Sequence, residues 1–407
     1  MKYRKYQPDK HKKAVRRIWK EIGWLSKENY DAMDIEIENS KTIVKEINGE
    51  AETLVSSVMG DYNYNGNNLN LSAIIAVTTS LVARKKGYAG KLTAQKIAED
   101  AKSGAEICGL GMFEQGYYDR LGFGSIGYQN WIQFCPENLN IKINRELPKR
   151  YSFEDYVRIH ESRINRIKKN GALNLPEHIT KAGLKFNEKK SLVLGYENDK
   201  GNITHHFLLR DANTSHGPVM VDWMAYRNYE QFRDLLGLLK SFEDQIFAIT
   251  MPEPPLMQFQ DFLDKPFRNY MKTAKSKYKF YNNARANHQF RILNIFKCIE
   301  KTSVRNNVKF NLELNDPIKD FFDDDAEWKG ISGEYVIELG ENSRIKKGID
   351  NRLPKIKTNV NNFTRMWMGV LPASVLQIYE NFEGDEKLIK KLDDIFNFHK
   401  PCIDWGF

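Results

Sequence analysis

The most informative stretch of this 407-residue chain reads Val77-Thr78-Thr79-Ser80-Leu81-Val82-Ala83-Arg84-Lys85-Lys86-Gly87-Tyr88-Ala89-Gly90. It continues an apolar, β-branched run over residues 69–79, which predicts a strand. A basic turn follows the strand. Beyond Gly87, alanine and isoleucine recur at helical spacing, with Ala94, Ile97, Ala98 and Ala101 on one face. The stretch therefore predicts a strand, a basic turn and a helix in direct succession.

Such a turn is suited to bind phosphate. Gly87 and the small Ala89 let a ligand approach the backbone. The first amides of a helix point toward an anion, and the helix dipole favours negative charge there. Arg84, Lys85 and Lys86 add positive charge. The spacing fits neither G-x-x-x-x-G-K-[ST] nor G-x-G-x-x-G. An ordinary basic turn before a surface helix would give the same pattern, so the motif alone leaves both interpretations open.

The sequence around this stretch alternates strands and helices. An amphipathic helix is expected over residues 10–22 and a strand over 53–59. Asn65-Gly66 predicts a hairpin turn into the strand over 69–79. Cys108-Gly109-Leu110 returns to the sheet after the helix that follows Gly87. Helices packed on a mixed sheet indicate an α+β (mixed α/β) fold.

Breaks in composition predict three domains. Prolines and polar residues cluster over 136–148, and the sequence beyond them again alternates helices and strands. An apolar pattern begins near residue 286, and residues 308–314 alternate as a one-sided strand does. We therefore expect domains over 1–147, 148–285 and 286–407.

Composition excludes several classes of protein. Lys and Arg number 62 against 53 Asp and Glu, a net charge of +9, but the basic residues are diffuse and favour a solvated surface over a nucleic-acid footprint. No apolar run approaches the roughly 18 residues of a membrane span, and no secretory signal is expected. The cysteines lie far apart, which argues against zinc and disulfides and for a cytoplasmic protein. The four are Cys108, Cys135, Cys298 and Cys402.

A second informative stretch reads Phe113-Glu114-Gln115-Gly116-Tyr117-Tyr118-Asp119-Arg120-Leu121-Gly122-Phe123-Gly124. A tyrosine hydroxyl can donate a proton to a departing thiolate, since their reference pKa values are about 10 and about 8.5. Tyr118 and Tyr117 are both candidates, and simple packing would also explain either.

The two stretches together resemble the GNAT acetyltransferases. Residues 84–89 match that family's pyrophosphate loop, R-x-x-G-x-G/A, and residues 113–124 match its tyrosine-bearing turn, in which Tyr118 holds the acid position. The resemblance implies acetyl-CoA as co-substrate and no metal. The cofactor-binding residues it implies are Val77, Thr78, Thr79, Arg84, Lys85, Lys86, Gly87, Tyr88, Ala89, Gly90, Phe113 and Glu114.

Nearly the whole chain resembles the Eis-type (enhanced intracellular survival) acetyltransferases. The further features are the crossover over residues 264–291 and the ending Trp405-Gly406-Phe407. This resemblance implies two tandem GNAT-like lobes, a sterol-carrier-like domain over 286–407 and a homohexamer. It also implies that the terminal carboxylate, here that of Phe407, acts as the base. A frayed end is the alternative, but the large Ile403, Trp405 and Phe407 favour a docked one.

The expected function is a cytoplasmic, acetyl-CoA-dependent N-acetyltransferase. A primary amine would attack the thioester directly, and the acceptor is left open among aminoglycoside-like compounds, lysine side chains and polyamines. No nucleic acid or membrane is expected as a partner. The second lobe lacks an Arg-x-x-Gly-x-Ala loop, so we expect it to shape the acceptor pocket without binding CoA. The alternative is a non-catalytic carrier protein that uses the sterol-carrier-like domain.

Overall fold

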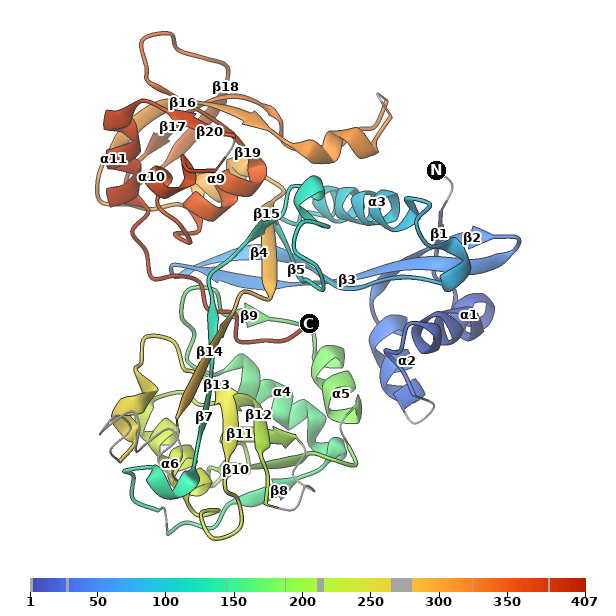
Figure 1. Ribbon diagram of the computed structural model, residues 1–407, viewed down its shortest axis with the longest axis vertical. Coiled ribbons are helices and arrows are strands. Elements are labelled where there is room, and N and C mark those ends of the chain that lie inside the picture. Colours follow the sequence, from blue (N-terminus) through green and yellow to red (C-terminus); the bar gives the residue numbers. More distant parts are fainter. Residues whose placement is uncertain are drawn as a thin grey trace.

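The fold is taken from a computed structural model of the chain (Figure 1). The structure describes residues 3–26, 29–143, 145–186, 188–210, 216–264, 280–323, 325–379 and 381–407. Most of the crossover expected over residues 264–291 therefore lies outside the described residues. The described strands form three sheets, each accompanied by helices.

The first sheet and its helices make up the first lobe. They comprise β1 (Arg4–Lys5), β2 (Lys41–Ile47), β3 (Glu50–Tyr64), β4 (Asn67–Thr79), β5 (Ile107–Gly111), β6 (Gly124–Ser125), β9 (Leu173–Asn174), β15 (His288–Ile292), α1 (Pro8–Glu21), α2 (Tyr30–Glu38) and α3 (Tyr88–Lys102). The strand order is β1-β2-β3-β4-β5-β15-β6, with β9 beside β3. Strands β4 and β5 are parallel, and the helix α3 connects them. In Figure 1, α3 lies on one face of the sheet and α1 and α2 on the other.

Burial on both faces explains the apolar sequences of β2 and β3. Successive side chains of a strand point to opposite faces. Accordingly Ile43 and Val55 pack in the cluster under α3, whereas Val44 and Leu54 pack in the cluster under α1 and α2. Each strand therefore needs apolar residues at consecutive positions.

The second sheet forms the second lobe. Its elements are β7 (Gln129–Phe134), β8 (Lys149–Tyr151), β10 (Leu192–Glu197), β11 (Ile203–Arg210), β12 (Val219–Ala225), β13 (Ile249–Pro252), β14 (Tyr281–Arg285), α4 (Tyr156–Ile164), α5 (Glu177–Phe186) and α6 (Tyr229–Lys240). The strand order is β14-β7-β13-β12-β11-β10-β8. Strands β12 and β13 are parallel and are joined by α6, which repeats the β4-α3-β5 arrangement of the first lobe. The expected α+β class with two tandem lobes is confirmed.

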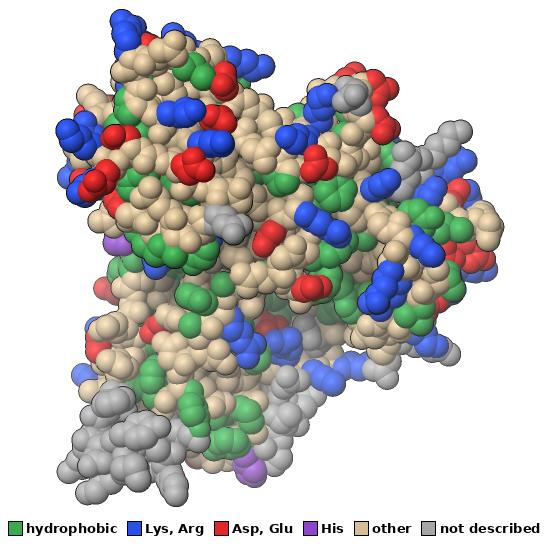
Figure 2. Space-filling model, turned by 45° about the horizontal axis from the view of Figure 1, so that its top comes forward, with side chains coloured by type: hydrophobic (Ala, Val, Ile, Leu, Met, Phe, Trp, Pro, Cys, Tyr) green, Lys and Arg blue, Asp and Glu red, His purple; other side chains and the backbone are tan. Residues whose placement is uncertain are grey.

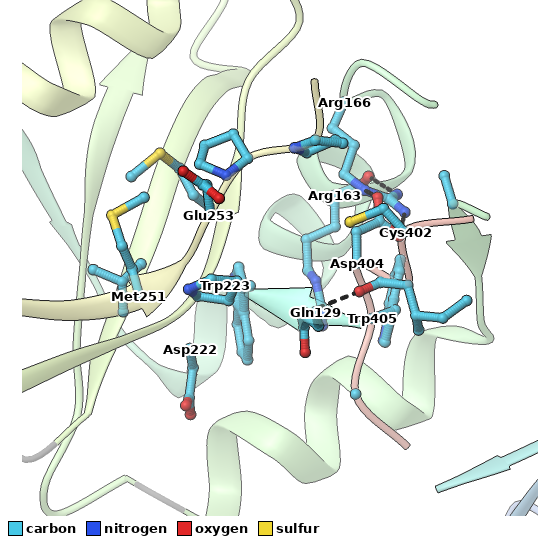
Figure 3. Close-up of a pocket in the computed structure, with 18 of the residues that line it drawn as sticks. Gln129, Arg163, Arg166, Asp222, Trp223, Met251, Glu253, Cys402, Asp404 and Trp405 are labelled. Carbon is cyan, nitrogen blue, oxygen red and sulfur yellow. Dashed lines mark hydrogen bonds and ion pairs between the residues drawn. The ribbon is translucent and has the colours of Figure 1, made fainter. Parts of the chain in front are cut away.

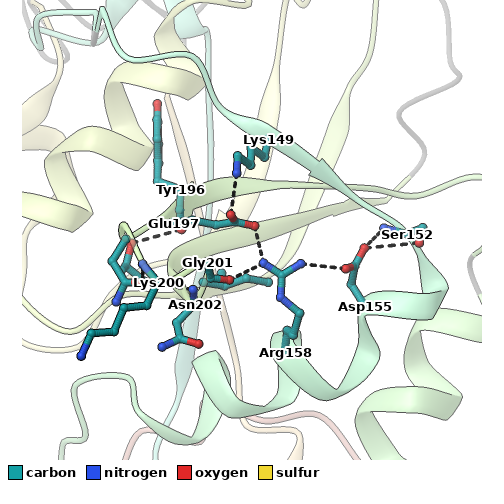
Figure 4. A network of polar contacts seen from close by, with 12 residues as sticks. Lys149, Ser152, Asp155, Arg158, Tyr196, Glu197, Lys200, Gly201 and Asn202 are labelled. Atoms are coloured by element: carbon teal, nitrogen blue, oxygen red, sulfur yellow. Dashed lines mark hydrogen bonds and ion pairs between the residues drawn. The ribbon is translucent and has the colours of Figure 1, made fainter.

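An ion-pair network links β8, α4 and β10 in the second lobe (Figure 4). Glu197, at the end of β10, accepts a hydrogen bond from Lys149 Nζ at 2.6 Å and another from Arg158 of α4. Arg158 also pairs with Asp155 at 2.9 Å. The hydrogen bond from Lys149 is the main reason that the pKa of Glu197 is lowered. This network ties β8, α4 and β10 together and lines none of the cavities described below.

The chain crosses between the two sheets at two places. Strand β7 pairs with β13 and β14 in the second sheet, although its residues precede the expected boundary at 147. Strand β15 pairs with β5 and β6 in the first sheet, although its residues follow the expected boundary at 285. The range expected for the first domain thus contributes β7 to the second sheet, and the range expected for the third domain contributes β15 to the first sheet. The domain ranges remain a prediction.

A third unit packs on the first lobe. It consists of β16 (Val308–Asn315), β17 (Gly333–Leu339), β18 (Arg344–Lys347), β19 (Lys355–Asn359), β20 (Phe382–Gly384), α8 (Ile295–Glu300), α9 (Val360–Trp367), α10 (Ala373–Leu376) and α11 (Glu386–Ile395). The alternating run over 308–314 lies in β16, as expected. The apolar run from Ile292 resolves into the end of β15 and then α8, which Asn294 caps by accepting from Lys297 N at 3.1 Å.

The described residues contain no helix that is long and apolar enough to cross a membrane. On the face drawn in Figure 2, Lys and Arg side chains are scattered and interleave with Asp and Glu instead of forming one basic patch. The net charge is therefore spread over this face, as the sequence predicts.

Candidate active site

A gap opens in the first sheet between β4 and β5. The two strands pair from Leu71 and Ile107 to Ile74 and Leu110, and β4 then continues to Thr79 beside β3 alone. A β-bulge marks the point of separation: Ser57 faces Ile74 and Ser56 faces Ala76, so Ile75 is the extra residue. Beyond the bulge, alternate amides of β4 face the gap without a neighbouring strand among the described residues.

The basic turn leads from this gap into α3. A 3-10 turn over Leu81–Ala83 is followed by Lys85 at φ +59° and Gly87 at φ +75°. Both angles lie in the left-handed region, which glycine adopts without steric cost. Gly87 is the N-cap residue of α3 and supplies no side-chain cap, and the first turn of α3 contains no acidic residue. The first amides of α3 are therefore left to an external acceptor.

Positive charge surrounds this helix terminus. Arg84, Lys85, Lys86 and Gly87 are all exposed. Gly90, by contrast, is buried, and a Cβ there would lie 3.0 Å from the Phe321 ring of the third unit. An exposed basic turn on free helix amides is a suitable anion site.

Tyr118 is buried at the point where the strands separate. It packs in one apolar cluster with Ile74 and Leu110, the last residues that β4 and β5 pair. Its ring lies edge-on to those of Tyr117 at 4.9 Å and Phe113 at 5.8 Å, measured between centroids. Burial raises the pKa of the Tyr118 hydroxyl. The phenol consequently stays protonated throughout the physiological pH range.

Tyr117 occupies a different environment. It is only partly buried, and the guanidinium of Arg120 lies 4.5 Å from its ring centroid. Burial again raises the pKa of its hydroxyl, and Arg120 opposes that rise. The two tyrosines therefore differ in position, since Tyr118 faces the core and Tyr117 the surface.

The last residues of the chain are docked between the lobes, where Figure 1 marks the C-terminus. Asp404 accepts two hydrogen bonds from Arg166, at 2.8 Å from Nε and 2.7 Å from Nη2 (Figure 3). Gln129 Nε2 donates to the carbonyl of Ile403 at 3.1 Å. Trp405 is 2% exposed. The tail is therefore held by a bidentate ion pair, a hydrogen bond and a buried indole.

Arg163 holds Trp405 in place from the second lobe. Its guanidinium lies 3.7 Å from the ring centroid of Trp405 and 4.1 Å from that of Trp223. Its Nη1 donates to Thr180 Oγ1 at 3.1 Å. Burial lowers the pKa of this guanidinium. Stacking between two indoles supplies a cation–π attraction in place of hydration.

Phe407 lies next to the end of β5. A Cβ built on Gly111 would lie 3.0 Å from a carboxylate oxygen of Phe407, so a larger residue at position 111 would crowd the tail. The Phe407 ring lies 5.6 Å from that of His288, whose pKa is lowered to about 4 by burial. His288 is thus neutral near pH 7. No described lysine, arginine or histidine pairs with the terminal carboxylate.

A cavity of about 590 Å³ opens between the tail and the second lobe (Figure 3). Its wall includes residues of the tail, the end of β5, and strands β12 and β13 with the segment after β13. Glu253 is on this wall, and among the described residues its carboxylate accepts from two neutral donors, Phe259 N at 2.9 Å and Asn130 Nδ2 at 2.9 Å. Met112 belongs both to this wall and to the cluster around Tyr118.

The residues expected at the site thus fall into two groups. Residues 77–79, 84–90 and Tyr118 lie around the gap and the start of α3, with Phe113 against Tyr118 and Glu114 exposed beside it. Phe407 lies on the cavity wall, which includes none of the first group. The end of β5 separates the two. The roles of these residues remain predictions. Within the described residues no cluster of His, Cys, Asp or Glu could hold a metal ion.

Sequence reasoning missed the residues that other parts of the chain bring to the site. Arg163, Trp223 and Glu253 come from the second lobe. In the third unit, Asn361 binds the Tyr118 turn directly and Asp316 binds it through Arg291. None stands in a recognisable local motif. The pairing of β7 and β15 with distant strands, which short sequence windows do not reveal, is one of the contacts that bring these segments together.

Comparison with known families identifies the first lobe. Residues 2–126 match the family model described as an acetyltransferase (GNAT) domain. The match spans both the basic turn and the Tyr118 turn. The chain therefore contains a GNAT acetyltransferase domain, as the two motifs predict, and this supports the prediction of an acyltransferase. No curated protein sequence matches the chain.

Solved structures share the fold over the full length. A probable N-acyltransferase of unknown function from Enterococcus faecalis V583 has a TM-score of 0.80 at 15% identity, covering 100% of this chain and 99% of that one. A GCN5-related N-acetyltransferase from Anabaena variabilis ATCC 29413 has a TM-score of 0.78 at 14% identity, and Eis1 from Mycobacterium abscessus 0.76 at 14%, each covering 100% of both chains. At such identities the likeness establishes the fold alone.

Proposed function

We propose that the protein is an acetyl-CoA-dependent N-acetyltransferase. The observation that carries the proposal is the gap between β4 and β5, which leads directly to an uncapped, basic helix start. A long thioester can lie along the free amides of β4 while its pyrophosphate is bound at α3. The matched GNAT domain contains both features.

In this proposal the first lobe binds acetyl-CoA. The amides of Val77, Thr78 and Thr79 hold the pantetheine arm and the acetyl carbonyl. The amides from Lys85 to Gly90 bind the pyrophosphate, and Arg84, Lys85 and Lys86 neutralise its charge. Phe113 and Glu114 lie beside the thioester end of the site.

The reaction is a direct transfer. The bound ammonium first loses a proton to solvent. The neutral amine then attacks the thioester carbonyl, and amides of Thr78 and Thr79 stabilise the oxyanion that forms. The intermediate collapses with loss of the CoA thiolate, which takes a proton from the Tyr118 hydroxyl. The attacking nitrogen gives its proton to the Phe407 carboxylate. The products are an amide and free CoA thiol.

The surroundings of Tyr118 support its assignment as the acid. Burial holds the phenol in its protonated form, and its position in the cluster of Ile74 and Leu110 is where the gap begins. Tyr117 faces the surface and stacks with Arg120. Tyr118 is therefore the better candidate of the two.

The acceptor amine is proposed to enter the cavity between the lobes. Glu253, whose charge no described lysine or arginine neutralises, and the Phe407 carboxylate would attract an ammonium group. An aminoglycoside-like compound, a lysine side chain or a polyamine would suit this charge. The indole of Trp223 offers an apolar surface for the carbon chain of such an acceptor.

We further propose the Eis-type organisation for the chain. It comprises an acetyltransferase domain over 1–147, a second GNAT-like domain over 148–285 and a sterol-carrier-like domain over 286–407, assembled as a homohexamer in the cytoplasm. In this organisation β7, from the first domain, pairs with β13 of the second, and β15, from the third domain, pairs with β5 of the first. No observation favours the non-catalytic carrier.

A thiol-release assay tests the function. The full chain is incubated with acetyl-CoA and one amine from each class, and free CoA is followed with a thiol reagent while mass spectrometry identifies the acetylated product. We expect amine-dependent thiol release. Release that never exceeds the rate without amine, together with no detectable binding of CoA, would overturn the proposal.

A further inference from the structure

The turn that carries Tyr118 is held by a side chain from the third unit. Asn361, in α9, donates from Nδ2 to the carbonyl oxygens of Asp119 and Phe123, both at 2.7 Å. These two residues bracket the 3-10 turn that follows Tyr118 directly. A single amide group thus spans the turn and fixes the distance between its two ends.

A buried ion pair holds the middle of the same turn. Arg291, in β15, donates from Nη1 to the carbonyl of Leu121 and pairs through Nη2 with Asp316, at the end of β16. Both side chains of the pair are 0% exposed. The Asp316 carboxylate also accepts from the amides of Ile318 at 3.2 Å and Ile331 at 2.9 Å, so its charge is fully satisfied. Removing either partner of such a pair leaves an uncompensated buried charge.

The third unit also touches the start of α3. The Phe321 ring fills the space beside Gly90 and lies 6.0 Å from the guanidinium of Arg120 in the Tyr118 turn. The third unit therefore contacts both sequence motifs of the first lobe, on the side of the sheet where α3 lies.

We propose that Asn361, together with the Arg291–Asp316 pair, positions Tyr118 for proton transfer, so that the third unit takes part in acetyl transfer. This inference rests on the proposed role of Tyr118. A general acid must lie about 2.6–3.2 Å from the atom it protonates. A displacement of about 1 Å can lower a rate about 100-fold. Within the turn, the amides of Leu121, Gly122 and Phe123 donate to the carbonyls of Tyr118 and Asp119, which sets its local shape. Arg291 and Asn361 bind the carbonyls of Leu121 and Phe123 and so fix the turn relative to the rest of the molecule.

Asn311 offers a matched control in the same unit. Its Nδ2 also donates to two backbone carbonyls, those of Asp350 at 2.8 Å and Leu353 at 3.1 Å. These carbonyls belong to the loop between β18 and β19, and among the described residues no hydrogen bond joins this loop to the Tyr118 turn. Asn311→Ala and Asn361→Ala therefore both remove a paired donation to two carbonyls, and Asn311→Ala also removes the hydrogen bond that its Oδ1 accepts from Asp350 N at 2.9 Å, which makes it the more severe control.

The experiment measures kcat and the KM for acetyl-CoA in both variants, with circular dichroism to follow folding. We expect Asn361→Ala to lower kcat about 10- to 100-fold with the KM changed less than about twofold, whereas Asn311→Ala keeps its kcat. Asn361→Asp, which keeps the side-chain size but removes both N–H donors, should behave like Asn361→Ala and serves if that variant does not fold. An equal fall of kcat in both Asn variants would overturn the proposal.

A double-mutant cycle separates this inference from the proposed function. In a Tyr118→Phe background the acid is gone, so Asn361→Ala should lower kcat little further. The same fold-loss in both backgrounds would show that Asn361 does not act through Tyr118. A Tyr118→Phe protein with the wild-type kcat would instead remove Tyr118, and with it this inference, while thiol release by the wild type would leave the acetyltransferase function standing.

Discussion

The two lobes share one arrangement of strands and helix but differ where that helix begins. In the first lobe the N-cap of α3 is Gly87, which has no side chain. In the second, the N-cap of α6 is Asn228, whose side chain accepts from Gln231 N at 2.9 Å. The connection from β12 to α6 spans only residues 226–228, against 80–87 before α3. Glu230 places a negative charge in the first turn of α6.

The second lobe nevertheless keeps the gap between its central strands. Strands β12 and β13 pair only at Val219 with Ile249 and at Met220 with Thr250. Leu208 faces Trp223 and Leu209 faces Val221, so Asp222 is the extra residue of a bulge like that at Ile75. In the second lobe, however, Asp222 and Trp223 at this bulge line the cavity that opens between the tail and the second lobe. The comparison teaches that splayed strands occur in both lobes, whereas the uncapped helix start and the basic turn that the proposed phosphate site requires occur, among the described residues, in the first lobe.

The largest expected effect concerns Tyr118, which follows β5 in the first lobe. The corresponding segment of the second lobe, residues 253–264 after β13, contains no tyrosine. Tyr118→Phe keeps the ring and deletes the proton donor, so kcat should fall about 10²–10⁴-fold while CoA affinity is retained. Because burial raises the pKa of Tyr118, the wild-type rate should show no loss from its deprotonation across the neutral range. Steady-state kinetics from pH 6 to 9 check both points. A near wild-type Tyr118→Phe beside an inactive Tyr117→Phe would reassign the acid.

The next effect concerns the tail that lies between the lobes. A C-terminal extension converts the Phe407 carboxylate into a neutral amide, which cannot accept the amine proton. We expect kcat to fall about 10²-fold or more, whereas an N-terminal tag of equal length should be harmless. Equal kcat values for the two tagged forms would exclude Phe407 from the reaction.

A smaller change is expected from the cavity wall of the second lobe. Glu253→Gln keeps the shape of the side chain and removes its charge. The KM for a cationic amine should rise about 10- to 100-fold, since a hydrogen bond to a charged group contributes about 1.5–3 kcal/mol. The affinity for CoA in the first lobe should not change. An altered CoA affinity with an unchanged KM for the amine would contradict the assignment of the two lobes.

The smallest effect is on stability, and it concerns His206 in the second lobe. Burial lowers the pKa of His206 to about 3, and its Nε2 accepts from Trp223 Nε1 at 3.2 Å. The unfolded chain takes up this proton near pH 6.5, so stability is full above that pH and is lost as the pH falls toward 3. From pH 7.5 to 5 the loss from this group should be about 2 kcal/mol. Urea unfolding at both pH values should show a smaller loss in His206→Gln than in the wild type; equal losses would contradict it.

Local motifs made the first lobe predictable. The basic turn and the Tyr118 turn each lie within a short window, and their glycines at positions 87 and 122 adopt the positive φ angles that such turns require. The apolar end at Trp405 likewise predicted a docked tail, because burying a large indole stabilises the folded state.

The rest of the site depends on contacts between distant segments. Asn361 lies 242 positions from Asp119, and Arg166 lies 238 positions from Asp404, so no window contains both partners. The exchange of β7 and β15 between sheets was also missed, because an apolar strand carries no mark of the sheet it joins. Sequence spacing was enough to propose the candidate groups of the first lobe, whereas tertiary structure was needed to find those of the second lobe and third unit.

The most direct test of the difference between the lobes is a calorimetric titration with CoA. Gly87→Asp places a carboxylate at the start of α3, where it repels phosphate, although it could cap the helix; Gly87→Asn is the neutral control of nearly the same shape. Asn228→Asp makes the corresponding change at α6. We predict one CoA per wild-type chain, a Kd raised more than about tenfold in Gly87→Asp and less in Gly87→Asn, and no change in Asn228→Asp. Two CoA molecules per chain, or binding that survives Gly87→Asp but is lost in Asn228→Asp, would contradict the account.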